Sequence, residues 1–188
     1  MQDLDPRHLS VIDELDRLGR ERDDAWQVPR VEGELLHHIA LASGAKLIVE
    51  IGTSYGFSGL FFAAALKVTG GKLDTIDVSQ KKFDSSRATF ERAGVGEVVQ
   101  NHLGDARQVV AGIAGEIDLA FLDADKAQTR SYFELIWPRL RRGGAILTDN
   151  ALTHRSELGE FVKYVRSLKG ASSTEVPVGN GLEWTIKV

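Results

Sequence analysis

The first 44 residues show the apolar spacing of two helices. Hydrophobic residues recur every three or four positions from Pro6 to about Asp24, which predicts a charged helix with one apolar stripe. A second helix is predicted to begin at Pro29 and to end near Gly44, because proline suits a first helical turn and glycine follows a last one.

From Leu47 onward, short apolar runs alternate with longer amphipathic segments. The runs predict five strands at Leu47–Ile51, Lys72–Asp77, Val98–His102, Ile117–Leu122 and Ala145–Thr148. The intervening segments predict helices at Gly59–Val68, Gln80–Ala93, Ala106–Ile113, Thr129–Leu140 and Glu157–Leu168. Continuously apolar strands separated by helices indicate a parallel sheet that is covered on both faces.

The C-terminal segment breaks this alternation. Ser172–Val176 and Leu182–Val188 are strand-like runs joined through Pro177, Gly179 and Gly181, which indicates a hairpin whose last strand runs antiparallel to the sheet. We therefore predict one α/β domain over residues 1–188. Its doubly wound, mostly parallel seven-stranded sheet has helices on both faces and a C-terminal antiparallel hairpin.

Composition narrows the classes of protein to which this chain can belong. A chain of 188 residues, 43% hydrophobic and 27% charged, can build one sizeable core. A net charge of −4 without a long Lys/Arg cluster disfavours nucleic acid, and no apolar run approaches the ~20 residues that cross a membrane. The N-terminus lacks a signal-peptide pattern, and the absence of cysteine excludes disulfides and thiolate chemistry. We expect a cytoplasmic protein.

The carboxyl ends of the predicted strands should carry the chemistry, because ligands of open parallel sheets bind there. The first strand runs into a turn in which Gly52 and Gly56 let the backbone approach a ligand. The second strand ends in Asp77, placed to accept hydrogen bonds from both hydroxyls of a ribose. A tight turn followed by a surface acid is the alternative interpretation. The glycine spacing is not that of a nicotinamide-binding turn.

Two more strand ends offer oxygen ligands for a cation. Asp123 follows the fourth strand, and Asp149 and Asn150 follow the fifth. Neighbouring strands lie ~4.8 Å apart, so these side chains can share Mg²⁺, Ca²⁺ or Mn²⁺, which favour hard oxygen ligands. Helix capping or solvent exposure is the alternative. Lys126 is placed to take a proton from a hydroxyl at that cation, or else it forms a surface ion pair with Asp125.

Five motifs occur together in the order that resembles one enzyme family. They are E-I-G-T-S-Y-G-F-S, the aspartate that ends the second strand, L-G-D-A, F-L-D-A-D-K and T-D-N. The set resembles the cation-dependent O-methyltransferases, which use S-adenosylmethionine and include catechol and caffeoyl-CoA O-methyltransferases and small bacterial relatives. The resemblance implies a Rossmann-like class I methyltransferase fold. Residues 1–44 would cover the site and residues 45–188 would form the cofactor-binding core.

The resemblance also implies a role for each matching residue. S-adenosylmethionine would contact Val28, Glu50, Gly52, Thr53, Ser54, Ser58, Asp77, Val78, Asp105, Ala106, Asp123 and Asp125. A divalent cation, with Mg²⁺ expected first and Ca²⁺ or Mn²⁺ as alternatives, would be held by Asp123, Asp149 and Asn150. The catalytic residues would be Lys126, as base, and Asp123. The acceptor would lie against Lys126, Asn150 and His154.

The implied reaction is an in-line displacement on a small hydroxylated acceptor, a catechol-like phenol or a vicinal diol. The cation would bind two adjacent oxygens and lower the pKa of one, Lys126 would remove its proton, and the oxygen would attack the methyl carbon of the sulfonium. Trp26 is a candidate wall of the acceptor pocket, or it packs the N-terminal helix. Ala151 and Leu152 stand where relatives usually carry Trp and Gly, so a plant-type CoA ester is not expected.

Other functions stay open at this point. They are a methyltransferase of the same fold that acts without metal on another acceptor, and a non-catalytic S-adenosylmethionine-binding protein. A nucleic-acid amino-methyltransferase is disfavoured because D-A-D-K stands where that class carries Asn/Asp-Pro-Pro-aromatic, and a dehydrogenase is disfavoured by the glycine spacing. The apolar stripe of the first helix favours a homodimer slightly over packing within the chain.

Overall fold

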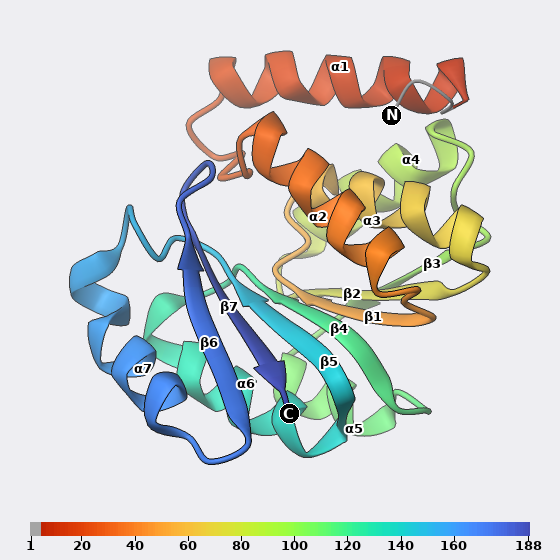
Figure 1. Cartoon of the computed structure of the whole chain (residues 1–188). Coiled ribbons are helices and arrows are strands. Elements are labelled where there is room, and N and C mark those ends of the chain that lie inside the picture. Colours follow the sequence, from red (N-terminus) through yellow and green to blue (C-terminus); the bar gives the residue numbers. More distant parts are fainter. Residues whose placement is uncertain (1–4) are drawn as a thin grey trace.

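Figure 1 shows the computed structural model of the chain, which describes residues 5–188. Seven strands form one sheet in the order β3-β2-β1-β4-β5-β7-β6. They are Leu47–Ile51 (β1), Lys72–Asp77 (β2), Val99–Leu103 (β3), Ile117–Leu122 (β4), Leu140–Thr148 (β5), Ala171–Val176 (β6) and Leu182–Lys187 (β7). Strands β1 to β5 are parallel, and β7 runs antiparallel to β5 and β6. The predicted fold class is confirmed.

Helices cover both faces of the sheet. The α-helices are Pro6–Glu21 (α1), Arg30–Ala42 (α2), Phe57–Thr69 (α3), Gln80–Arg92 (α4), Ala106–Gly112 (α5), Thr129–Ile136 (α6) and Arg155–Ser167 (α7). Helices α2, α3 and α4 form one layer, α5, α6 and α7 form the other, and α1 lies outermost across α3 and α4 (Figure 1). Among residues 5–188, no helix is both long and apolar enough to cross a membrane.

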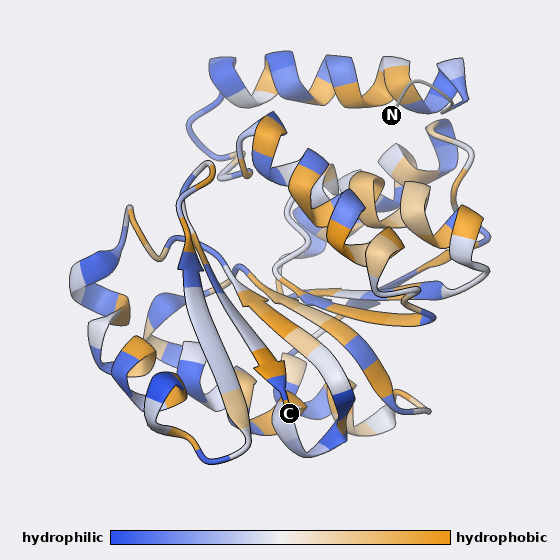
Figure 2. Cartoon of the chain, viewed as in Figure 1, coloured by the Kyte–Doolittle hydropathy of each residue, from blue (hydrophilic) through white to orange (hydrophobic). Residues whose placement is uncertain are grey.

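Two hydrophobic cores lie on opposite faces of the sheet. On β1, Ile48 packs toward the layer with α3, whereas Val49 and Ile51 pack toward the layer with α6. Figure 2 shows the result as apolar central strands beneath helices whose outer faces are hydrophilic. Each fully buried Leu, Ile or Phe contributes roughly 1.5–3 kcal/mol. Burial on both faces therefore stabilises the central strands.

The apolar stripe of α1 is used within the chain. Val11, Ile12 and Leu15 are buried in the same core as α3. The structure therefore shows packing within the chain, which is the alternative interpretation of this stripe.

The predicted boundary between α6 and β5 is wrong. The helix ends at Ile136 and is followed by a 3₁₀ turn over Trp137–Arg139, because Pro138 has no N–H to continue the α-helix. Strand β5 begins at Leu140 rather than Ala145. After Leu140 the strand continues with two arginines and two glycines, whose hydropathy does not indicate a strand. Arg141 Nε donates to Asp118 Oδ1 of β4 at 2.5 Å.

Candidate functional site

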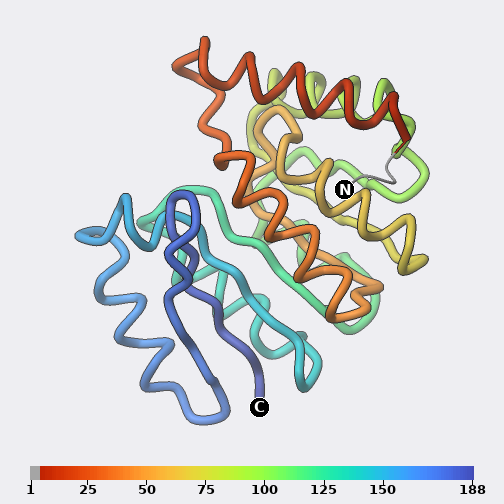
Figure 3. The backbone as a smooth tube through the Cα atoms, turned by 45° about the horizontal axis from the view of Figure 1, so that its top comes forward, coloured from red at the N-terminus to blue at the C-terminus, as the bar shows by residue number. Residues whose placement is uncertain are grey.

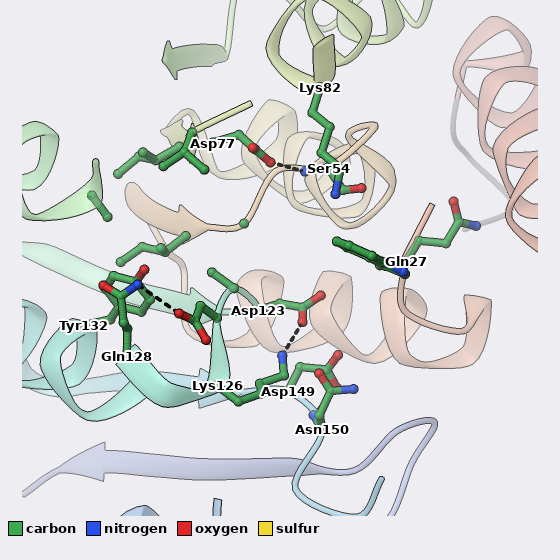
Figure 4. A pocket seen from close by; sticks show the side chains of 18 of the residues that line it. Gln27, Ser54, Asp77, Lys82, Asp123, Lys126, Gln128, Tyr132, Asp149 and Asn150 are labelled. Atoms are coloured by element: carbon green, nitrogen blue, oxygen red, sulfur yellow. Dashed lines mark hydrogen bonds and ion pairs between the residues drawn. The ribbon is translucent and has the colours of Figure 1, made fainter. Parts of the chain in front are cut away.

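A cavity of about 760 Å³ opens where β1, β2, β4 and β5 end. Its walls also include the segment before α2, the start of α5, the Lys126–Gln128 turn and the tip of the β6–β7 hairpin. Figure 4 shows Ser54 and Asp77 on one side and Asp123, Lys126, Asp149 and Asn150 on the other. The cavity lies where ligands of parallel sheets bind.

Backbone geometry shapes the wall that follows β1. Gly52 has φ +107°, and a Cβ there would lie 2.1 Å from the backbone oxygen of Asp123, so the position requires glycine. The N–H groups of Gly52 and Thr53 donate to Ile76 O at 2.9 and 3.3 Å. The turn is thereby held against the ends of both β2 and β4.

Asp77 is fixed at the end of β2. Its Oδ2 accepts the backbone N–H of Ser54 at 2.9 Å, and its Oδ1 accepts that of Ser79 at 2.9 Å. A carboxylate has about four acceptor positions, so both oxygens keep capacity for ligand hydroxyls. Asp105 lies across the cavity, and hydrogen bonds from Arg107 lower the pKa of Asp105 to about 2.

Some of the predicted cofactor residues lie beneath the cavity rather than on its surface. Glu50 is fully buried, and its two oxygens accept the hydroxyls of Ser58 and Thr75, each at 2.6 Å. Burial raises the pKa of Glu50 to about 7, although these hydrogen bonds oppose the shift. Thr53 Oγ1 lies 2.6 Å from Thr75 Oγ1, and Val28 is buried in the core. In this structure these side chains support the turn from below.

The other predicted cofactor residues line the cavity. They are Gly52, Ser54, Asp77, Val78, Asp105, Ala106, Asp123 and Asp125.

The ends of β4 and β5 bring two carboxyls and an amide together. Leu122 and Thr148 are paired in register, so Asp123 and Asp149 follow from adjacent strands. Burial, with the charge of Asp149, raises the pKa of Asp123 to about 8, although Lys126 opposes the shift. Asn150 donates its side-chain N–H to Thr153 Oγ1 at 3.1 Å, and Asn150 also lines the cavity.

Lys126 projects into this group from a 3₁₀ turn. Its Nζ lies 2.9 Å from Asp123 Oδ1, and its side chain is largely buried. Asp125, the partner considered from sequence, instead accepts the Ala127 N–H at 3.1 Å and the Gln128 side-chain N–H at 2.9 Å. The surface ion pair between Lys126 and Asp125 is therefore not present.

The side chains at the ends of β4 and β5 determine which metal ion could bind there. No group of three or more His, Cys, Asp or Glu side chains placed to hold a metal occurs within residues 5–188. The available set is the two carboxylates of Asp123 and Asp149 and the amide of Asn150, all hard oxygen donors. The buried carboxyl of Asp149 and the largely buried carboxyl of Asp123 have a single ammonium, that of Lys126, to compensate them, and this arrangement fits an added divalent cation.

Strained backbone is concentrated at this cavity. Within residues 5–188, the non-glycine residues with positive φ are Trp26, Ser54 and Asn150, and all of them line it. Such conformations cost about 1–3 kcal/mol each and are typical of functional sites. Trp26 is 77% exposed at the mouth, with Lys82 Nζ 4.5 Å from its ring centroid. His154 lines the same cavity.

Several lining residues were not found from the sequence. They are Gln27, Ile51, Ile76, Lys82, Gly104, Ala124, Gln128, Tyr132, Glu157 and Asn180. Ile51, Ile76 and Ala124 directly adjoin residues that the sequence predicts for the site, so the same strand ends indicate them. Asn180 lies between two glycines of the hairpin turn, a pattern that was interpreted only as a turn.

Comparisons with known proteins identify the family. A family described as O-methyltransferase matches residues 7–163. The chain is 32% identical to a catechol O-methyltransferase of Mycobacterium tuberculosis over 143 residues, which cover 73% of this chain and 64% of that protein. It is 35% identical to tricin synthase 2 of Oryza sativa subsp. japonica over 175 residues, which cover 86% of this chain and 60% of that protein. The chain thus spans less than two thirds of the length of either relative.

A solved structure has the same fold. The O-methyltransferase of Bacillus cereus, crystallised with S-adenosylhomocysteine (SAH), superposes with a TM-score of 0.84 at 23% identity, covering 95% of this chain and 91% of that one.

Proposed function

The chain belongs to the O-methyltransferase family, and we propose that it transfers the methyl group of S-adenosylmethionine to a hydroxyl of a small molecule with the aid of a divalent cation. One observation carries the proposal. A single cavity holds Asp77, an acid fixed in a position to bind ribose hydroxyls, and a group of Asp123, Lys126, Asp149 and Asn150 that is largely buried.

The methyl donor would occupy the end of the cavity near β2 and α5. Asp77 would accept both ribose hydroxyls, and the apolar faces of Val78, Ala106 and Tyr132 would border the adenine. Ser54 and Gly52 would contact the methionine part, with Glu50 and Ser58 supporting the turn from below. The Bacillus cereus protein with this fold was crystallised with SAH, which supports this assignment.

The cation would lie at the ends of β4 and β5, held by Asp123, Asp149 and Asn150. A divalent cation supplies Lewis acidity there, which lowers the pKa of an acceptor hydroxyl. Lys126, as the neutral amine, would receive the hydroxyl proton, the acceptor oxygen would form the new C–O bond, and the C–S bond of the donor would break to leave a neutral thioether. Fixed placement of both reactants in one cavity contributes much of the rate.

The acceptor would enter between Trp26 and His154. An exposed indole at the mouth favours a flat, apolar acceptor, and two adjacent oxygens suit a cation held by only three protein groups. We therefore propose a catechol-like phenol or a vicinal diol. The name of the Mycobacterium tuberculosis relative, a catechol O-methyltransferase, is consistent with this class.

The test is methyl transfer from S-adenosylmethionine to a panel of catechols, with Mg²⁺ and after EDTA. Turnover that EDTA abolishes and Mg²⁺ restores supports the proposal. Turnover that is indifferent to EDTA indicates a methyltransferase that acts without metal. Tight SAH binding by calorimetry without turnover on any panel member indicates a binding protein or a different acceptor.

We also propose that the protein forms a homodimer, which light scattering would test. The stripe of α1 that suggested it is buried within the chain, so a dimer would have to use another surface.

A further inference from the structure

Glu32 is a buried acid beside the cation end of the cavity that the proposed reaction does not use. It lies in the first turn of α2 and is 0% exposed. Its Oε2 accepts the backbone N–H of Asn180 at 2.8 Å, whereas its Oε1 has no hydrogen-bond partner among the described residues. Burying a carboxylate with a free oxygen is unfavourable unless a ligand or a charge compensates it.

Asn180 connects Glu32 to Asp149. Its side-chain N–H donates to Asp149 Oδ2 at 3.3 Å, and its backbone oxygen accepts the N–H groups of Leu152 and Thr153 at 3.1 and 3.2 Å. Figure 3 shows the tip of the hairpin beside the beginning of α2. A Cβ at Gly179 would lie 2.3 Å from Glu32 Oε2, so the tip is seated directly on this carboxyl.

The charges around Glu32 favour a cation. Glu32 is buried beside the carboxyl of Asp149, and Asp123 is the next acid that acts on it. Among the described residues, the one basic side chain in ion-pair contact with any of these three acids is Lys126, on Asp123. A carboxylate next to a ligand strengthens cation binding through its charge and through the orientation it imposes.

We propose that Glu32 and Asn180 are positioning residues of the cation site. Asn180 holds the Asp149 carboxylate in place, and the free oxygen of Glu32 contributes negative charge beside it. Glu32 is not assigned as a ligand, because within residues 5–188 no three acidic side chains are arranged to hold a metal together. The inference rests on the proposed function, since it concerns the cation that Asp123, Asp149 and Asn150 would bind.

The test measures binding of Mn²⁺ by electron paramagnetic resonance, which reports the free ion directly and needs no turnover. Glu32→Gln keeps an oxygen for the Asn180 N–H and removes the charge, so the Kd for Mn²⁺ should rise about 10- to 100-fold. Asn180→Ala keeps the charge and removes the contact to Asp149, and it should raise the Kd by a smaller factor. Glu34→Gln is the matched control, because Glu34 lies on the same helix, partly exposed and paired with Arg30; its Kd should equal that of the native chain.

The outcomes separate this inference from the proposed function. SAH binding without metal should be the same in all variants, which would show that they are folded. If Asp149→Asn weakens Mn²⁺ binding and Glu32→Gln does not, the inference is wrong and the cation site stands. If the native chain does not bind Mn²⁺, both the inference and the cation part of the proposed function are overturned. If Glu32→Gln loses SAH binding, that variant is not properly folded and Asn180→Ala becomes the test. A Kd for Mn²⁺ that is unchanged in Asn180→Ala would then overturn the inference.

Discussion

The two ends of the cavity differ in how their buried acids are satisfied. At the methyl-donor end, both oxygens of Glu50 accept hydroxyls and both oxygens of Asp77 accept backbone N–H groups. At the end proposed for the cation, Asp123 and Asp149 follow adjacent strands, and Glu32 keeps one oxygen without a hydrogen-bond partner among residues 5–188. One end has its hydrogen bonds in place, and the other brings carboxyl groups together with fewer partners.

This difference indicates two ways of preparing a site. A saturated network fixes the shape of a wall and needs no ligand to be stable. An unsaturated group of carboxyls costs stability in the free protein and repays it when a cation binds. The proposed methyl-donor end therefore has its shape fixed before a ligand binds, and the proposed cation end has carboxyl groups that a bound cation would stabilise.

The largest effect is expected at the cation end. Replacing Lys126 by alanine removes the group placed to receive the proton, so kcat should fall about 10²- to 10⁴-fold. The Kd for SAH should change little, because the donor is held at the other end. Steady-state kinetics and calorimetry measure the two quantities. Lys163→Ala, at an exposed position on α7, is the control and should keep full activity; an equal kcat in both variants would show that Lys126 is not the base.

The second prediction concerns the pH dependence of stability that Glu50 causes at the methyl-donor end. The pKa of Glu50 is raised to about 7 from 4.5 in the unfolded chain, so between these values the native state keeps a proton that the unfolded state has lost. Stability due to this group should therefore fall as the pH rises through that interval, by about 3 kcal/mol. Glu50→Gln should remove this part of the pH dependence. Urea unfolding at about pH 5 and about pH 7.5 measures it, and parallel pH profiles for both proteins would contradict the assignment.

The smallest effect is expected at the mouth. Trp26 is mostly exposed and contacts Lys82 through its ring, an interaction worth roughly 0.5–1 kcal/mol at exposed sites. Trp26→Ala should raise KM for a catechol several-fold and leave the Kd for SAH and the Tm nearly unchanged, whereas Trp26→Phe should restore KM. A loss of SAH binding in the alanine variant would place Trp26 at the donor end instead.

The sequence was most informative where strands end. The apolar runs predicted the order and type of the elements, and the rule for parallel sheets directed attention to Asp77, Asp123 and Asp149, all of which line the cavity. Such predictions need only local periodicity and the geometry of adjacent strands. The start of β5 was missed because its first residues carry charge and glycine in a strand that is held by Asp118 and its neighbours.

The remaining part of the site depends on tertiary docking. Gln27, Tyr132 and Asn180 approach the cavity from a loop, a helix face and a hairpin tip, and no spacing rule connects them to the strand ends. Glu32 is a charged residue in a segment that the sequence predicts only as a helix, and no pattern marks it as the fully buried residue that it is. Only the packing of α2 against the hairpin gives it a partner.

The hydrogen bond between Glu32 and Asn180 joins positions that are 148 residues apart. Ribosomes deliver a chain from its N-terminus, so the parts that hold the methyl donor emerge well before the hairpin that completes the cation end. A nascent or C-terminally trimmed chain would therefore lack the means to complete its acceptor side. If the proposed cation site is correct, competence for reaction would come only after Asn180 has been made, later than competence to bind the methyl donor.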